Sequence, residues 1–210
     1  MGDIVQDSQL ILKGKFVSLR SMNESDFYKI IEWRNNPEIN RYLNQPFKLT
    51  MELQYKWYRE KYLKSNDILF MIIEIKNKTR IGTIGINDLD YKRKIGIVGR
   101  LLIGEEYYRV SKEFIEATIL FYDYLFYNLK LKKLYGHVVI ENRKVISFDK
   151  KYGFTATRKT IFPQYCDVNG MKLIEMVNTK VQYEKAKKKI EPIIQYFKIN
   201  KKINTKEETL

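Results

Sequence analysis

A group of polar side chains stands at the start of one expected helix. Arg109, Ser111 and Lys112 precede or open a stretch with apolar residues at helical spacing that continues to about residue 126. Unpaired backbone N–H groups and the macrodipole make a helix N-terminus favourable for anions. These three side chains add donors, and two of them carry positive charge. These features suit an anion at the helix start, and the alternative is an ordinary helix start with Ser111 as its cap.

The elements around this helix form a strand–helix–strand unit. The strand IGIVGRLLIG (95–104) precedes the helix, and the strand KLYGHVVI (133–140) follows it. A unit of this kind places its two strands side by side and parallel. Asn142 then caps a short helix that Gly153 closes.

The remaining elements complete an α/β pattern. A first strand is expected at 10–20, and a three-stranded meander extends to residue 104. Helices are expected from about 23 until Pro37 ends the first, and from 50 to 63. A hairpin with its turn at 169–170 closes the domain, and an amphipathic helix occupies 184–197.

The order of these elements resembles the GNAT (GCN5-related) N-acetyltransferase superfamily over about residues 10–183. The stretch ENRKVISFDKKYGF (141–154) resembles the family signature N-x-x-S-I-x-L-Y-E-K-L-G-F. The resemblance implies an α/β GNAT fold: a mixed central sheet of about seven strands, helices on both faces and a C-terminal helical extension. We expect a GNAT domain at 1–183, followed by a basic helix and tail at 184–210. The implied enzyme is an acyltransferase that uses acetyl-coenzyme A and no metal.

The resemblance also implies how acetyl-coenzyme A binds. In the family, a bulge splays two parallel strands, and the pantetheine arm adds to the exposed edge like a further strand. The strand GRLLIG (99–104) corresponds to that edge, and the segment after it corresponds to the pyrophosphate loop, with Val110 and Lys112 in place of the usual glycines. The implied cofactor-binding residues are Leu101, Leu102, Ile103, Arg109, Val110, Ser111, Lys112, Asn142, Phe148 and Lys151.

The two sequence positions that hold proton-transferring residues in many family members hold other residue types here. The family tyrosine that protonates the leaving thiolate corresponds to Asp149, and a frequent glutamate corresponds to Ile97. Asp149 is a useful acid only if burial raises its pKa by several units. Tyr165, on the closing hairpin, and His137, on the strand at 133–140, are the other candidates. A water-mediated exit of the proton also stays open.

The acceptor is indicated by the stretch KIIEWRNNPEINRYL (29–43). It resembles the W-R-N-x-P-E-I start of two GNAT branches, which acetylate nucleotide-linked amino sugars and the N-termini of ribosomal proteins. The resemblance places Trp33, Arg34 and Asn35 at the acceptor pocket, although Trp33 would also fit a core position. The strand GRLLIG favours the amino-sugar branch. The net charge of +14 disfavours polycationic acceptors such as polyamines.

Composition indicates a cytoplasmic protein of one main domain. The 210 residues are 44% hydrophobic, with a sequence pI of about 9.6, and the single cysteine, Cys166, excludes an internal disulfide. The N-terminus does not resemble a secretory signal, so we expect no membrane partner. We do not expect nucleic acid either, because much of the basic charge lies in the tail. The expected partner is a small-molecule amine, possibly a nucleotide sugar, and a homodimer stays open.

Two other hypotheses stay open. The departures at Ile97, Val110, Lys112 and Asp149 fit a catalytically degenerate GNAT-fold interaction protein. The lysine-rich tail and the many tyrosines fit an RNA- or ribosome-binding module, whose binding would depend steeply on salt.

Overall fold

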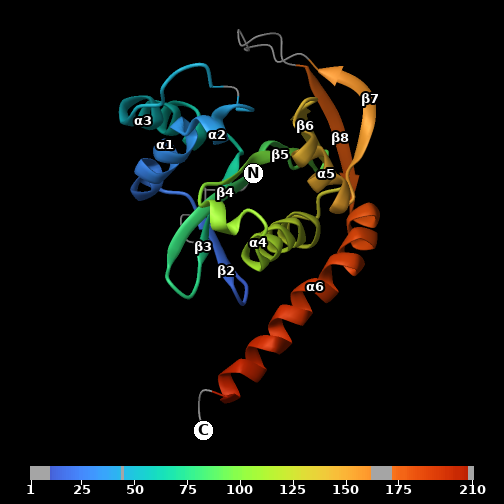
Figure 1. Ribbon diagram of the computed structural model, residues 1–210. Helices are drawn as coiled ribbons and strands as arrows, with labels where there is room; N and C mark the ends of the chain where they lie inside the picture. Colours follow the sequence, from blue (N-terminus) through green and yellow to red (C-terminus); the bar gives the residue numbers. More distant parts are fainter. Residues whose placement is uncertain (1–9, 44, 162–171, 208–210) are drawn as a thin grey trace.

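The computed structural model describes residues 10–43, 45–161 and 172–207, and shows one mixed sheet with helices on both faces (Figure 1). The spatial order of the strands is β1-β2-β3-β4-β5-β6-β8-β7. The strands are β1 (Ile11–Lys13), β2 (Val17–Ser21), β3 (Ile68–Glu74), β4 (Thr79–Asp90), β5 (Ile95–Ile103), β6 (Lys133–Val139), β7 (Thr155–Ile161) and β8 (Leu173–Thr179). The helices and helical turns are η1 (Glu24–Asp26), α1 (Phe27–Asn35), α2 (Pro37–Asn40), α3 (Met51–Glu60), η2 (Tyr62–Lys64), η3 (Glu106–Tyr108), α4 (Lys112–Asp123), η4 (Tyr124–Asn128), α5 (Arg143–Lys151) and α6 (Lys180–Glu207). The α/β GNAT architecture expected from the sequence is confirmed, with eight strands instead of about seven.

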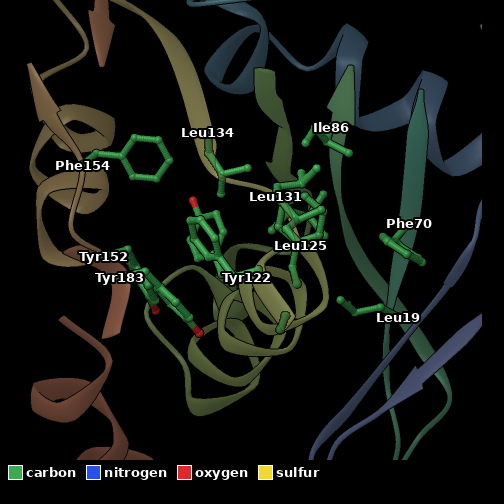
Figure 2. Packing of buried hydrophobic residues seen from close by; sticks show 14 of the residues in the cluster. Leu19, Phe70, Ile86, Tyr122, Leu125, Leu131, Leu134, Tyr152, Phe154 and Tyr183 are labelled. Atoms are coloured by element: carbon green, nitrogen blue, oxygen red, sulfur yellow. The ribbon is translucent and has the colours of Figure 1, made fainter. Parts of the chain in front are cut away.

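The sheet has an apolar core on each face because side chains alternate along its strands. On β3, Phe70 and Ile72 pack with α4, whereas Leu69 and Met71 pack with α1. Figure 2 shows the larger core, in which Tyr122 of α4 lies among side chains of the sheet and of the C-terminal elements. These two apolar cores hold α4 on one face of the sheet and α1 on the other.

The unit β5-α4-β6 has the parallel neighbours that the sequence predicts. Ile95–Val98 of β5 pair with Lys133–Gly136 of β6 in parallel, and every other pairing in the sheet is antiparallel among the described residues. Asn142 caps α5 by accepting a hydrogen bond from Val145 N at 3.3 Å, and Gly153 ends the helix at φ 99°. A backbone with positive φ favours glycine, as expected for this position.

Three expected boundaries are corrected by the structure. The segment 10–20 forms two paired strands, β1 and β2, because the chain turns back between Lys13 and Val17. The first helix ends at Asn35, and Pro37 opens the short helix α2 at its first position, where a missing N–H costs nothing.

The C-terminal helix is also longer than expected, since α6 begins at Lys180 and continues to Glu207. A capping box explains this start: Thr179 N donates to Gln182 Oε1 at 3.0 Å, and Gln182 N donates to Thr179 Oγ1 at 3.4 Å. α6 contacts α4 through Lys187, whose Nζ lies 2.8 Å from Asp123 Oδ2. No helix within the described ranges is both long enough and apolar enough to span a membrane.

Candidate active site

The strands β5 and β6 separate after a short parallel ladder. The last paired residues are Val98 and Gly136, yet β5 continues to Ile103 and β6 to Val139. Beyond Gly136, β6 pairs only with β8 on its other side. This separation produces a strand edge in the middle of the sheet.

A bulge at Arg100 marks the place where β5 turns away. Its register with β4 shifts by one residue between Gly99 and Leu102, and Arg100 adopts φ 51°, which is uncommon for a residue with a side chain. The hydroxyl of Thr83 donates to Arg100 O at 2.7 Å and so satisfies the carbonyl that the bulge displaces. The strand is therefore redirected by a specific, hydrogen-bonded irregularity.

The backbone of Ile103 faces the separated edge. Gly104 N donates to Ile81 O at 3.0 Å, so the backbone of Gly104 points toward β4. Hydrogen-bonding directions alternate along an antiparallel strand, so the N–H and C=O of Ile103 point toward the side of β6, and those of Leu101 follow two residues earlier. An extended ligand can add to this edge as a strand does, through main-chain hydrogen bonds. Leu102, between them, points its backbone at β4 and its side chain at the cavity described below.

The N-terminus of α4 lies directly after the end of β5. Ser111 caps it by accepting a hydrogen bond from Phe114 N at 3.2 Å. Val110, directly before this cap, is 96% exposed. Lys112 Nζ lies 3.5 Å from Glu113 Oε1 and stands over the rings of Phe16 and Phe197, at 5.3 and 5.9 Å from their centroids.

Arg109, at the end of η3, reaches Glu106 Oε1 at 3.4 Å across an exposed surface. An ion pair this exposed contributes little stability, so Arg109 is free to exchange Glu106 for a stronger anionic partner. Arg109, Ser111 and Lys112 thus stand together around one helix start, as the sequence predicts.

On the neighbouring helix α5, Phe148 faces α4. Its ring stacks on Phe114 with centroids 5.0 Å apart and an interplanar angle of 12°. Lys151 is exposed one turn further along α5. The two helices therefore contact each other through stacked aromatic rings near the start of α4, and Lys151 adds an exposed cation on α5.

Asp149, also on α5, points inward beneath the separated strands. Its side chain is 8% exposed, and a methyl group built on Gly136 would lie 3.9 Å from Asp149 Oδ2. Burial raises the pKa of Asp149 to about 7. No described residue donates a hydrogen bond to it or forms an ion pair with it. The carboxyl group is therefore partly protonated near neutral pH at the point where the parallel ladder ends.

On the opposite face of the sheet lies a cavity of about 510 Å³. Its walls come from α1, α3, the segment between them and the bulged part of β5, and include Trp33, Arg34, Trp57, Arg100 and Leu101. The indole of Trp33 packs so closely on Gly104 that a Cβ at that position would overlap it. The cavity and the separated strand edge therefore meet at the residues of the bulge.

Comparison with known proteins decides the family. The family described as acetyltransferase (GNAT) domain matches residues 17–155, about two thirds of the chain. The chain belongs to the GNAT acetyltransferase family. It is therefore an acyltransferase, of a family that takes its acyl group from acetyl-coenzyme A. No curated protein sequence matches it.

Solved structures share the GNAT fold at low identity. A spermidine N-acetyltransferase from Vibrio cholerae in complex with coenzyme A and spermine is 20% identical, with a TM-score of 0.69 over 81% of this chain and 99% of that one. FdhC, a nucleotide-linked sugar GNAT, is 23% identical, with a TM-score of 0.69 over 86% and 96%. A GCN5-related N-acetyltransferase from Brucella melitensis is 15% identical, with a TM-score of 0.74 over 89% and 86%.

The structure brings most, but not all, of the predicted residues of this GNAT enzyme together. His137 points to the sheet face opposite to Gly136, where its Nε2 lies 4.0 Å from Glu175 Oε2. Burial lowers the pKa of His137, although Glu175 and Asp88 oppose the shift. Tyr165 lies outside the described residues.

Of the three residues predicted to bind the acceptor, Trp33 and Arg34 line the cavity, whereas Asn35 does not. Asn35 exchanges two hydrogen bonds of 2.8 Å with the backbone of Leu49, which anchor the segment between α1 and α3. Asn35 therefore shapes the cavity wall from behind.

Sequence reasoning missed three residues of the site, Arg100, Gln45 and Thr83. Arg100 is the one charged residue of β5, and a charge inside an otherwise apolar strand was a usable signal. Gln45 and Thr83 gave no such signal, because their roles depend on partners far along the chain, Arg34 and Arg100.

Proposed function

We propose that this enzyme transfers the acetyl group of acetyl-coenzyme A to the amino group of a nucleotide-linked amino sugar. The observation that carries the proposal is the succession of three features along the separated strands: the end of the β5–β6 ladder at Val98 and Gly136, the buried carboxyl of Asp149 beside Gly136, and the cavity that begins at the bulge of β5. A thioester lying along β5 would there face an acceptor on one side and an acid on the other.

The cofactor side of the proposal uses residues from three elements. The backbone of Leu101 and Ile103 would hydrogen-bond the pantetheine arm, with Leu102 completing the strand edge. The N–H groups at the start of α4 would hold the diphosphate, because this helix end provides donors and a positive dipole. Further side chains are proposed to contact each part of acetyl-coenzyme A. These are Arg109, Val110, Ser111 and Lys112 around the diphosphate, Asn142 and Phe148 along the pantetheine arm, and Lys151 near the nucleotide.

The chemistry balances as an ordinary acyl transfer. The neutral amine nitrogen attacks the thioester carbonyl carbon, forming a C–N bond, and the C–S bond then breaks. The backbone N–H groups of the bulge would stabilise the negative oxygen that develops. Asp149 would donate its proton to the departing sulfur, and the proton lost by the amine would leave through water in the cavity. Because burial keeps its pKa near 7, Asp149 can both give up this proton and regain it near neutral pH.

The nucleotide-linked acceptor is supported by the shape and charge of the cavity. Indole surfaces of Trp33 and Trp57 suit sugar or base rings, and FdhC, one neighbour in fold, is a nucleotide-linked sugar GNAT. Another neighbour is a spermidine acetyltransferase, but a cationic acceptor would meet the positive charge of Arg34 and Arg100 in this cavity.

The test combines titration calorimetry with a thiol-release assay. Acetyl-coenzyme A should bind, and coenzyme A thiol should be released fastest when an amino sugar linked to a nucleoside diphosphate is added. The variant S111A should weaken cofactor binding, while the distant exposed variant K132Q serves as its control. No binding at millimolar acetyl-coenzyme A would end the proposal, and turnover of spermidine alone would redirect the acceptor.

A further inference from the structure

Two arginines share the acceptor cavity with few acidic partners. Arg34 of α1 and Arg100 of β5 both line it, and the exposed residues Lys56 and Lys61 add two cations at its rim. Glu60 is the only carboxylate among the lining residues. A concave surface with this charge balance attracts anions.

Arg34 is held in place without being neutralised. Its Nε donates to Gln45 Oε1 at 2.7 Å, and Gln45 Nε2 in turn donates to Arg34 O at 3.3 Å and Phe47 O at 3.2 Å. No described carboxylate lies within ion-pair distance of Arg34. Burial lowers the pKa of Arg34, and the nearby charge of Arg100 lowers it further. A fixed, partly desolvated guanidinium whose terminal nitrogens have no described acceptor is arranged for a bidentate anion.

Arg100 is held from the other side of the cavity. Its Nη2 lies 2.8 Å from Asp67 Oδ2, and its guanidinium stands over the ring of Trp57, 5.0 Å from the centroid. Its Nε is buried and has no hydrogen-bond partner. An unpaired buried donor is costly unless a ligand or water satisfies it. The left-handed backbone at this residue is a further cost that functional sites often bear.

We infer that Arg34 and Arg100 form an anion subsite that selects acceptor amines carrying a phosphate or diphosphate group. The inference rests on the proposed acetyl transfer and deepens it by naming the group that is recognised. The reacting amine would lie at Leu101, beside the separated edge. The phosphate would sit between the two guanidinium groups, with the rim lysines extending the positive surface toward a second phosphate. Both arginines would act in acceptor selection and not in the acyl transfer itself.

The experiment compares three acceptors that contain the same amino group on related six-carbon skeletons. Glucosamine has no anionic group, glucosamine 1-phosphate carries a phosphate, and glucosaminic acid, the open-chain acid, carries a carboxylate. The measurement is kcat/KM for thiol release at saturating acetyl-coenzyme A. Dissociation constants of each acceptor for the coenzyme A complex are measured alongside. The wild type should favour the phosphate over glucosamine by about 30-fold, as expected for a charge-assisted bidentate contact.

The variant R34Q tests the subsite directly. It removes the charge on α1, and we expect it to lower kcat/KM for the phosphate at least tenfold while changing that for glucosamine less than threefold. R100Q should act in the same direction, and thermal unfolding checks that both variants fold. K132Q loses the same charge at an exposed position away from the cavity and should change neither rate.

Each outcome decides between this inference and the proposal on which it rests. Equal rates for glucosamine and its phosphate, or an equal loss on both in R34Q, would overturn the subsite and leave acetyl transfer intact. A preference for glucosaminic acid over the phosphate would overturn the phosphate assignment. Failure of acetyl-coenzyme A to bind the wild type would instead remove the proposed function.

Discussion

Replacing Asp149 with asparagine should make the enzyme more stable and much less active. The carboxyl group is buried among apolar and aromatic side chains. Tyr122 lies close enough that, besides burial, the charge of Asp149 raises the pKa of Tyr122. Asparagine has almost the same shape and cannot ionise. The substitution therefore removes the charge and keeps the packing.

The gain in stability follows from the pKa of Asp149 in the folded and unfolded chains. Burial raises this pKa from 3.8 to about 7. Between these values the folded chain binds more protons than the unfolded chain, so the free energy of unfolding falls as the pH rises from about 4 to about 7. A tenfold change in an ionisation constant equals about 1.4 kcal/mol. Ionised Asp149 therefore costs up to about 4 kcal/mol above pH 7, a cost that D149N avoids.

Urea denaturation at several pH values measures this effect. D149N should exceed the wild type by several kcal/mol at pH 8, and the difference should vanish below about pH 3, where aspartic acid is protonated in the folded and the unfolded chain. The exposed substitution E52Q is the carboxylate-to-amide control, and its difference from the wild type should stay small at every pH. A difference between D149N and wild type that is constant with pH would refute the burial argument.

The loss of activity follows from the role of Asp149 as an acid. Without a proton donor for the sulfur, kcat should fall about 100-fold or more. The wild-type rate should decline above pH 7 as Asp149 loses its proton, and this alkaline decline should be absent in D149N. Full activity of D149N, with an unchanged pH profile, would show that the proton leaves by another route.

Three further predictions concern the residues that position the site. In G104A, the added methyl group overlaps the indole of Trp33, which lines the cavity. KM for the acceptor should therefore rise at least tenfold while the affinity for acetyl-coenzyme A is kept. An unchanged KM would show that Trp33 does not pack on Gly104 in this way. Asp26 is completely buried, and although burial opposes its ionisation, hydrogen bonds from Arg20, from a backbone N–H and from a second arginine outweigh it and lower the pKa of Asp26. D26N should cost about 3 kcal/mol in urea denaturation, and wild-type stability from this group should be present above pH 3.8 and disappear as the pH falls through the lower, folded-state pKa. Loss of the Ser111 cap in S111A should cost about 1 kcal/mol of stability, and equal stability would mean that the helix start is held by other contacts.

The sequence predicted the elements whose patterns are local. Neighbours within a few residues determine the apolar run of β3, the alternation of β4, the caps Ser111 and Asn142, and the closing glycine Gly153. The parallel pairing of β5 with β6 followed from the strand–helix–strand order. Local patterning and topology rules therefore sufficed for the fold.

The burial of Asp149 left a signal in the sequence. Ile146, Asp149 and Tyr152 recur at a spacing of three on α5, and all three are buried. This spacing places the carboxylate on the apolar stripe of the helix. In contrast, the start of α6 was missed because Thr179, which forms the capping box, is also the last residue of β8. No loop separates the strand from the helix.

The bulge at Arg100 could not be read from the chain. The family resemblance implied a bulge near the strand 99–104 but did not indicate which residue is left-handed, and that residue is Arg100. Its conformation depends on the hydroxyl of Thr83 and the carboxylate of Asp67, which lie 17 and 33 residues away. Contacts of this range are set by the tertiary fold, and no local pattern encodes them.

The most direct test of the central claim is amide hydrogen exchange at β5, measured by NMR with and without coenzyme A. If the pantetheine arm adds to the separated edge, exchange at Ile103 should slow at least tenfold on binding, while Leu102, already directed at β4, should change little. Coenzyme A that binds without slowing exchange at Ile103 would contradict the account, because the arm would then lie somewhere other than between β5 and β6.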